Sequence, residues 1–535
     1  MSECRMELGA ALPDLTPQCL SHIFSHLSPH DAARGCCVQK LWRDLIVGDE
    51  HLWQRHLAEE LGISSKQGAD GQSTQTYWVA YTGWRKAFGR EYWPYLGRAV
   101  RAWTTIKGWL AANMPEILAT LRPGLSEAEA CAIESELGFA LPPALKVLYR
   151  LHDGQSLAHD DALERSIRLR RHGAAAAAGG GGSGSGSGAA AAAGGPTGGL
   201  EEEHVPLGGG GPVEQDAQVA SIFQGLFGGY VVYDHQVVSR MPPLRRAALW
   251  RSELVGGMAE NSRRIQERLG QTGGREAADQ RWRVECERRE EEARRAGLEP
   301  RASLDHLIPF SCSYNLEEKI FVADAVSGGL ALAKPRVGGW DLRQAVPGAG
   351  SRDGPLRWFE EYARRLESGY YQVGKPWVLP EQLSVITRII SLFPRTPPAM
   401  AEAVTRGVRV RASVVYVPEA VAPRGRHLFA YAIRFSLTED APLKRCQLTH
   451  RHWVIRDEQG RVLDTVHGEG VIGMYPILEP GQPEFVYCSC THQVATRGSM
   501  EGEFEFVGGT IERPEGGSFA VACPTFRLDM PDYIF

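Results

Sequence analysis

The sequence predicts a multidomain protein with a short α-helical module, a mixed α+β module and an all-β sandwich, in that order. Apolar residues recur at helical spacing in the first sixty residues, helical and strand-like segments follow one another up to residue 376, and apolar residues alternate from residue 400. The length of 535 residues suits several domains. Hydrophobic residues at 43% and charged residues at 23% exclude a chain that is disordered throughout.

Net charge and cysteine usage exclude several classes of protein. A formal net charge of -5 gives no general attraction to phosphate backbones or anionic lipid, so we expect neither nucleic acid nor a membrane as partner. The first fifteen residues lack the pattern of a secretory signal, and the sequence contains no apolar stretch long enough to span a bilayer. Eleven cysteines without a C-x-x-C pair argue against a disulfide framework. We therefore expect a cytoplasmic or nuclear protein, or both.

The N-terminal module is predicted to be a set of short helices. Thr16 and Pro17 form a helix start, and Ser28 with Pro29 forms a second one. A third helix is expected around 41–45. One face of the first helix carries apolar residues at i, i+3, i+4 and i+7, namely Leu20, Ile23, Phe24 and Leu27. So small a module cannot bury all its apolar groups alone, which predicts docking onto another protein.

Four signals in this segment resemble an F-box over residues 10–57. They are Leu12-Pro13, Ile23-Phe24-x-x-Leu27, Val38-x-x-x-Trp42 and Leu52-Trp53. Gln39 departs from the family, which usually has a cysteine beside the valine. The resemblance implies binding to the Skp-type adaptor of an SCF-type cullin–RING ubiquitin ligase; the alternative is a helical cap on the next domain. The implied adaptor contacts are Leu12, Pro13, Leu20, Ile23, Leu27, Leu52 and Trp53.

The middle of the chain alternates helix and strand signals. Ser126 and Glu129 form a capping box for a helix that ends at Gly138, and Leu141-Pro142-Pro143 starts another. Ten aromatic residues between 77 and 110 are interpreted as core packing, because a base-stacking platform would need a basic background. With strands at 226–233 and 320–324 and an aromatic helix at 356–366, the segment resembles a SUKH-superfamily α+β domain over residues 77–376.

Two inserts interrupt this middle module. Residues 173–212 are mostly Ala and Gly with some Ser, a composition that predicts a flexible surface loop. Residues 244–300 are rich in Arg, Glu and Ala, with opposite charges four residues apart, which predicts a solvated helix. A binding role for this helix stays open, since nothing in its pattern names a partner.

The C-terminal module, residues 400–530, is predicted to be an antiparallel β-sandwich. Apolar and polar residues alternate from Val408 to Tyr416, and further alternating runs are separated by Gly and Pro turns. Segments 429–434, 447–455, 468–473, 480–481 and 498–502, with Pro476, resemble the ApaG family. The resemblance implies a fibronectin-like sandwich used for binding, with no catalytic residues to carry over.

A glycine-rich segment in this module fits G-x-G-x-x-G. A dinucleotide site of the Rossmann type needs a helix after the glycines, and Pro476 and Pro480 block one. The looser hypothesis is a phosphate-bearing ligand held by backbone amides and basic side chains. Its candidate residues are Arg451, His452, Gly468, Gly470 and Gly473.

A metal site and a catalytic site are both weighed and not predicted. Cys488 and Cys490 share a strand face with His492 next in line, yet a packed core explains them better than zinc or copper does. No nucleophile elbow, P-loop or zinc-hydrolase motif is present in the sequence. We therefore expect no cofactor and no enzyme activity in the chain itself.

Together the resemblances to an F-box, a SUKH-superfamily domain and ApaG imply the substrate-recognition subunit of an SCF ubiquitin ligase. It would bind the adaptor, and through it the cullin, while the SUKH-like and ApaG modules hold a target of unknown identity for ubiquitination and proteasomal degradation. The alternative is a ligand-sensing protein whose ApaG domain binds a phosphorylated small molecule.

Overall fold

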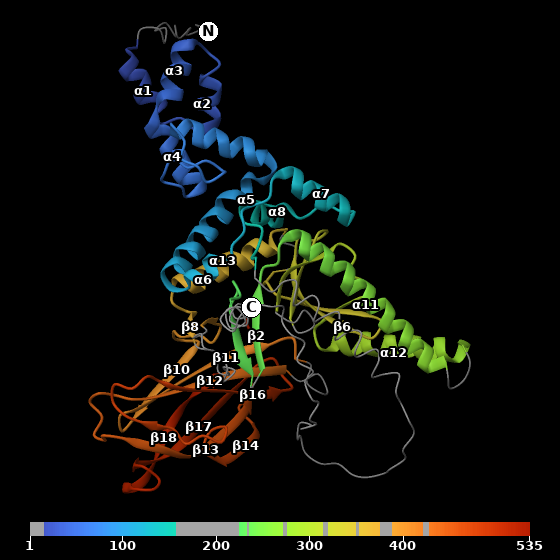
Figure 1. Cartoon of the computed structure of the whole chain (residues 1–535), viewed down its shortest axis with the longest axis vertical. Helices are drawn as coiled ribbons and strands as arrows, with labels where there is room; N and C mark the ends of the chain where they lie inside the picture. Colours follow the sequence, from blue (N-terminus) through green and yellow to red (C-terminus); the bar gives the residue numbers. More distant parts are fainter. Residues whose placement is uncertain are drawn as a thin grey trace, which may run out of the picture.

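The structure is a computed structural model that describes residues 15–156, 224–232, 235–270, 275–313, 319–348, 352–374, 388–420 and 427–535. Leu12, Pro13 and the insert at 173–212 lie outside the described residues. In Figure 1 the N-terminal helices lie at one end of the molecule, a mixed α+β module follows, and a β-sandwich lies at the other end. This order of modules is the predicted one.

Four short helices form the N-terminal module: α1 (Pro17–Phe24), α2 (Pro29–Gly35), α3 (Lys40–Gly48) and α4 (Glu50–Leu61). Side-chain oxygens cap three of them, as N-cap residues do when they satisfy free backbone N–H groups. Thr16 accepts from the amide of Cys19, Ser28 from that of Asp31, and Asp49 from that of Leu52. The starts of the first two helices are those that the sequence predicts.

A long helix joins this module to the rest of the chain. Helix α5 (Tyr77–Asn113) bends at Gly89, whose φ of 65° lies in the left-handed region that glycine adopts at little cost. Its aromatic side chains are largely buried, which confirms their interpretation as packing. Arg98 then fixes α5 to α13 (Gly354–Glu367), because its guanidinium pairs with both Glu360 oxygens at 2.8 and 2.6 Å and with Asp353 at 2.5 Å.

The central module is a nine-stranded sheet covered by helices. Helix α6 (Pro115–Leu118) follows α5, and α7 (Glu127–Leu137) begins at the predicted capping box and precedes α8 (Pro143–Leu151). The strand order is β3-β7-β6-β5-β4-β2-β1-β9-β8, antiparallel except for the β1–β9 pair. The strands are β1 (Gly229–Val232), β2 (His235–Arg240), β3 (Glu299–Arg301), β4 (Leu307–Ser313), β5 (Ile320–Asp324), β6 (Leu330–Arg336), β7 (Gly339–Gln344), β8 (Gln372–Gly374) and β9 (Ile389–Ser391).

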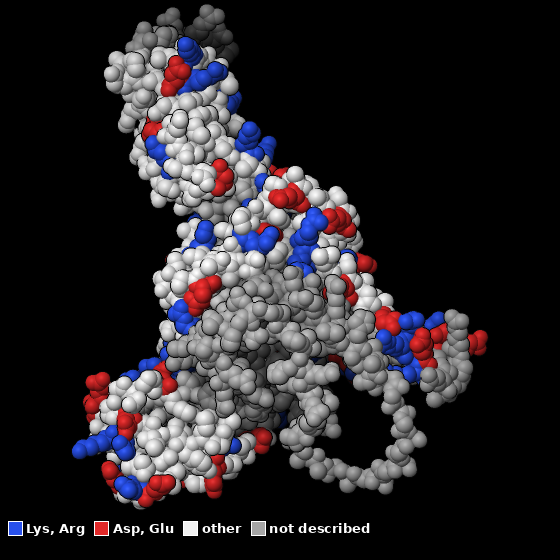
Figure 2. Space-filling view, viewed as in Figure 1, with Lys and Arg blue, Asp and Glu red and all other residues white. Residues whose placement is uncertain are grey.

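The charged insert forms a helical hairpin of α11 (Leu244–Gly270) and α12 (Arg275–Arg295), which projects from the central module (Figure 1). The sequence predicts a helical, solvated insert. The insert is helical, but the start of α11 is partly buried. Trp250 is buried, and the amide of Leu244 donates to Asp153 at 2.8 Å. Figure 2 shows Lys and Arg intermixed with Asp and Glu at the tip of the hairpin, so neither sign dominates there.

The C-terminal module consists of two antiparallel sheets packed face to face, as predicted. One sheet has the order β10-β11-β12-β16, the other β14-β13-β17-β18, with β15 beside β13. Phe435 of the first sheet meets Phe504 of the second at a ring distance of 4.6 Å. The strands are β10 (Met400–Thr405), β11 (Val408–Val417), β12 (His427–Leu437), β13 (Cys446–Asp457), β14 (Val462–Glu469), β15 (Ile477–Leu478), β16 (Phe485–Gln493), β17 (Gly498–Gly509) and β18 (Pro514–Arg527).

The end of α8 gives the chain an acid-sensitive contact. Burial, together with the positive charge of Lys107, lowers the pKa of His152 from 6.5 to about 4. Its ring lies 4.7 Å from that of Trp103. The unfolded chain therefore binds more protons between these two pH values, so stability rises with pH through this window and is lost as pH falls from 6.5 toward 4.

We expect His152→Gln to remove part of this acid sensitivity. Between neutral pH and about pH 5, the wild type should lose roughly 1 kcal/mol more stability than the variant. Thermal melting of both proteins at the two pH values checks this. If wild type and variant lose the same stability between the two pH values, the pKa of His152 is the same in the folded and the unfolded chain.

Candidate functional site

The predicted adaptor contacts divide into buried and exposed side chains. Leu20, Leu52 and Trp53 are 2%, 0% and 1% exposed. The indole of Trp53 also donates to the carbonyl oxygen of Ile46 at 2.7 Å. In this conformation these three side chains hold the helices together and present no surface to a partner, so a direct contact is not supported for them.

Ile23 is the predicted contact that lies open to solvent, with 45% of its surface exposed, while Leu27 is half-buried. The reason lies in the packing of α1 against α3. The buried ring of Phe24 lies 5.1 Å from the ring of the half-buried Trp42, and their chain neighbours Ile23 and Leu41 remain outside. The exposed large apolar side chains among the described residues of this module are Leu15, Ile23, Val38 and Leu41.

Leu15 and Leu41 are absent from the predicted contacts, and Val38 entered only as part of the motif. Apolar residues at helical spacing predict that a helix face is buried. The spacing does not show whether the face is buried within the chain itself or against a partner protein. The position of Leu41 directly before the half-buried Trp42 is the signal that could have identified it.

The second candidate site is a pocket of about 480 Å³ on the outer face of the β14-β13-β17-β18 sheet. In its register, His452 lies between His467 and Glu503, and the two imidazole rings stack at 4.0 Å. One row further along, His450 lies between Glu469 and Glu505, with its Nδ1 3.2 Å from a Glu505 oxygen. This face therefore brings together three histidine and three glutamate side chains in two neighbouring rows.

The predicted ligand residues fall into two groups. Arg451, His452 and Gly468 line the pocket. A side chain at Gly468 would come within 3.0 Å of the Arg451 guanidinium, so glycine makes room for that group. Gly470 and Gly473 instead build the turn after β14, with φ angles of 55° and 71°. This turn is followed by β15 and not by a helix, which agrees with the rejection of a Rossmann site.

Hydrogen-bond donors of this turn that could bind a phosphate group are already engaged within the protein. Arg451 Nη1 donates to the carbonyl oxygens of Glu469 at 2.9 Å and Gly470 at 2.7 Å, and the Gly470 amide donates to Thr449 at 2.7 Å. Glu503 and Glu505 also line the pocket, so an anion would meet carboxylates. The geometry disfavours a phosphate-bearing ligand here.

We accordingly expect millimolar pyrophosphate to leave the melting temperature of the full chain unchanged. A ligand at ten times its dissociation constant raises stability by about 1.4 kcal/mol, which a melting experiment detects. Calorimetric titration with pyrophosphate provides a second readout. A saturable rise in melting temperature that Arg451→Met abolishes would restore the phosphate hypothesis.

Cys488 of β16 lies in the interior of the sandwich. Burial raises the pKa of its thiol to about 12. Over the described ranges, no group of three or more His, Cys, Asp or Glu side chains is arranged to hold a metal ion. Nor does the described part of the chain contain a helix that is both long and apolar enough to cross a membrane.

Family comparisons match both ends of the chain. Residues 13–59 match the F-box-like family, and residues 419–508 match the ApaG domain. F-box protein SKIP16 of Arabidopsis thaliana is 30% identical over 547 residues, which cover 98% of this chain and all of that protein. F-box only protein 3 of Homo sapiens is 32% identical over 179 residues, 32% of this chain and 35% of that protein.

A bacterial relative matches the C-terminal module alone. Protein ApaG of Bdellovibrio bacteriovorus is 41% identical over 124 residues, which cover 23% of this chain and 90% of that protein. The F-box match lies over the α1–α4 module and the ApaG match lies within the β-sandwich. The chain therefore belongs to the family of F-box proteins that carry a C-terminal ApaG domain.

Proposed function

We propose that this F-box protein is the substrate-recognition subunit of an SCF-type ubiquitin ligase in the cytosol or nucleus. The observation that carries the proposal is the set of exposed apolar side chains of the F-box module, at the end of the molecule remote from the sandwich (Figure 1). A small helical module with uncovered Ile, Leu and Val side chains is suited to dock onto a partner protein. The partner is a Skp-type adaptor, which connects the chain to a cullin.

In this role the chain brings two proteins together and performs no bond chemistry itself. The F-box helices hold the adaptor, while the central and ApaG modules hold a target near the ubiquitin-loaded enzyme. Holding both partners raises their effective concentration for ubiquitin transfer. The ubiquitinated target would then pass to the proteasome.

The connection between the modules supports such a geometry. Trp53 of α4 packs against Trp78 of α5 at a ring distance of 4.5 Å. Glu60 of α4 accepts hydrogen bonds at 2.9 Å from both Tyr81 and Trp93 of α5. A target held by the distal modules would therefore keep a defined position relative to the adaptor. That the central module is a SUKH-type domain stays a prediction from its residues.

The adaptor face is tested by a charge placed on it. We expect Ile23→Asp to reduce co-purification of the full chain with a Skp-type adaptor by at least tenfold, because a buried unpaired carboxylate costs more than 1.4 kcal/mol. The substitution leaves the module folded, since Ile23 is outside its core.

The matched control is Ile511→Asp, which changes an isoleucine of similar exposure, 47% against 45%, in the sandwich. It should leave adaptor capture unchanged. Equal capture by wild type and Ile23→Asp would contradict the assignment of this face, whereas loss in both variants would point to a general effect of added charge.

A further inference from the structure

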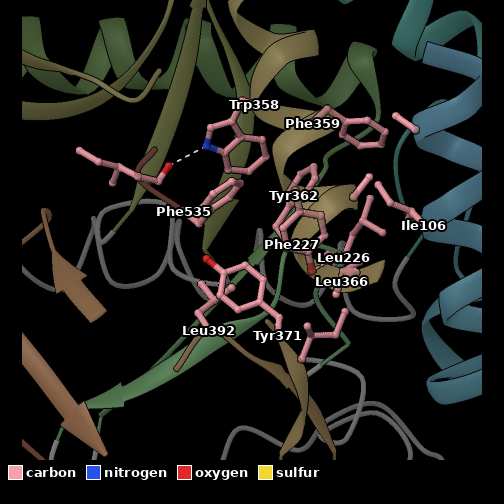
Figure 3. Packing of buried hydrophobic residues seen from close by; sticks show 14 of the residues in the cluster. Ile106, Leu226, Phe227, Trp358, Phe359, Tyr362, Leu366, Tyr371, Leu392 and Phe535 are labelled. Atoms are coloured by element: carbon pink, nitrogen blue, oxygen red, sulfur yellow. Dashed lines mark hydrogen bonds between the residues drawn. The ribbon is translucent and has the colours of Figure 1, made fainter. Parts of the chain in front are cut away.

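The last residues of the chain leave the sandwich and enter the central module. Strand β18 ends at Arg527, Leu528 is buried, and residues 529–533 are half-buried or exposed. Phe535 is only 6% exposed, and Figure 3 shows its ring beside Trp358, Tyr362 and Tyr371. Ring distances from Phe535 are 4.7 Å to Trp358, 5.7 Å to Tyr362 and 6.0 Å to Tyr371. The segment thus combines an accessible stretch with a buried aromatic anchor.

The central module also forms hydrogen bonds with the main chain of this segment. The amide of Ile534 donates to the carbonyl oxygen of Ala345 at 3.1 Å. The carbonyl oxygen of Ile534 accepts from the indole of Trp358 at 2.6 Å, the dashed line in Figure 3. The main-chain oxygen of Phe535 accepts from Lys319 Nζ at 2.5 Å. Three main-chain groups of Ile534 and Phe535 are thus hydrogen-bonded to the central module, and main-chain hydrogen bonds are a means by which domains hold extended peptides.

Lys319 makes this pocket distinct from an ordinary apolar core. Its side chain is fully buried, and its ammonium group lies 3.3 Å from the hydroxyl of Tyr230 and 4.5 Å from the centre of that ring. A buried cation requires acceptors, and the Phe535 oxygen supplies one. The guanidinium of Arg365 lies 4.7 Å from the centre of the Phe535 ring.

A cavity of about 250 Å³ adjoins residues 530–535, called the tail below, so these residues are not in contact with protein atoms on every side. Its wall is made partly by the tail itself, through Tyr533, Ile534 and Phe535, and partly by Tyr370 and Tyr371 of the central module and Tyr416 of the sandwich. Aromatic and arginine side chains in such a pocket are typical of strong anchor sites.

We propose that the central module is a peptide-recognition module whose pocket is occupied by the chain's own residues 530–535. The same pocket accepts, from another polypeptide, an extended segment with an aliphatic residue followed by an aromatic one, in the order Ile534–Phe535. Trp358, Tyr362 and Arg365 recognise the ring, and Lys319 recognises the main-chain oxygen. The peptide site itself does not depend on the proposed function. Only the statement that target proteins carry such a segment rests on it.

The test uses the full chain with Phe535→Ala and a chain that ends at Asp529. The probe is a labelled synthetic peptide with the sequence of residues 530–535, followed by fluorescence anisotropy. We expect saturable binding to both variants, and at least tenfold weaker binding by a peptide in which the Phe535 position is Ala. Unaltered full chain should bind the probe far more weakly, because its pocket is filled. Lys319→Met, added to Phe535→Ala, should weaken binding.

Folding of the variants is included in the test. If either variant lacks a cooperative melting transition, the peptide at about 1 mM should restore it, since a ligand stabilises the folded state that binds it. Folded variants that ignore the peptide, or unfolded variants that the peptide does not restore, would overturn the proposal. Adaptor capture by the Phe535→Ala chain is measured in parallel and should be retained, so a failure of the peptide site is distinguishable from a failure of the ligase assignment.

Discussion

Replacing Trp358 with Ala is expected to lower the free energy of unfolding of the central module by about 3–5 kcal/mol. The indole is fully buried and lies at the centre of an aromatic cluster, with ring distances of 4.7 Å to both Phe227 and Phe535. Truncation leaves a large cavity, and it also leaves the carbonyl oxygen of Ile534 without its hydrogen bond.

Denaturant unfolding of the full chain, followed by circular dichroism, measures this loss. Trp358→Phe is the matched comparison: it keeps an aromatic ring in the cluster but removes the N–H group, so it should cost about 1–3 kcal/mol. A Trp358→Ala protein with the stability of the wild type would show that the cluster is not the core of this module.

The second large effect is expected where α4 crosses α5. Gly97 lies against the main chain of α4, and a Cβ atom built on it would meet the carbonyl oxygen of Glu60 at 1.9 Å. A backbone atom cannot move aside as a flexible side chain does, so Gly97→Ala must push the helices apart. We expect a loss of about 2–3 kcal/mol.

Gly108 on the same helix supplies the control, because a Cβ atom there would meet no atom within 4 Å apart from its chain neighbours and the nearby backbone of its own helix. Gly108→Ala should be neutral or stabilise the chain by up to about 1 kcal/mol, since alanine favours helix over glycine. Thermal melting of the two variants checks the contrast. Equal melting temperatures would contradict a close contact between α4 and α5 at Gly97.

Local signals predicted the helix starts and the sandwich well. Ser126 with Glu129 forms the capping box that the sequence predicts, because a cap depends only on residues three apart. The alternation from Val408 reappears as strand β11, since one face of that strand is covered by the opposite sheet. Such features follow from neighbours in the chain.

Features that depend on distant partners were predicted less well. The composition of the charged insert concealed the buried start of α11, where Trp250 packs, because a few apolar residues are outnumbered by Arg and Glu. The predicted C-terminal module ends at residue 530, and the prediction does not include the packing of Phe535 in the central module. No periodicity in a short coil identifies which module will receive it.

The candidate sites show the same division. Of the five residues predicted to hold a ligand, strand pairing places Arg451, His452 and Gly468 at one pocket, while Gly470 and Gly473 lie in the turn after β14. The sequence did not reveal that Glu503 lies opposite His452, nor that the amide of Gly470 is already bonded to Thr449. At the adaptor face, burial separates Leu20 from its helix neighbour Ile23.

The most direct test of the ligase assignment is to mix the purified full chain with a Skp-type adaptor and a cullin, and to measure the mass of the product by size-exclusion chromatography with light scattering. We predict a stoichiometric complex of all three proteins. Elution of a well-folded chain alone, with the adaptor in a separate peak, would contradict the account and leave the exposed apolar side chains of the F-box helices without their proposed partner.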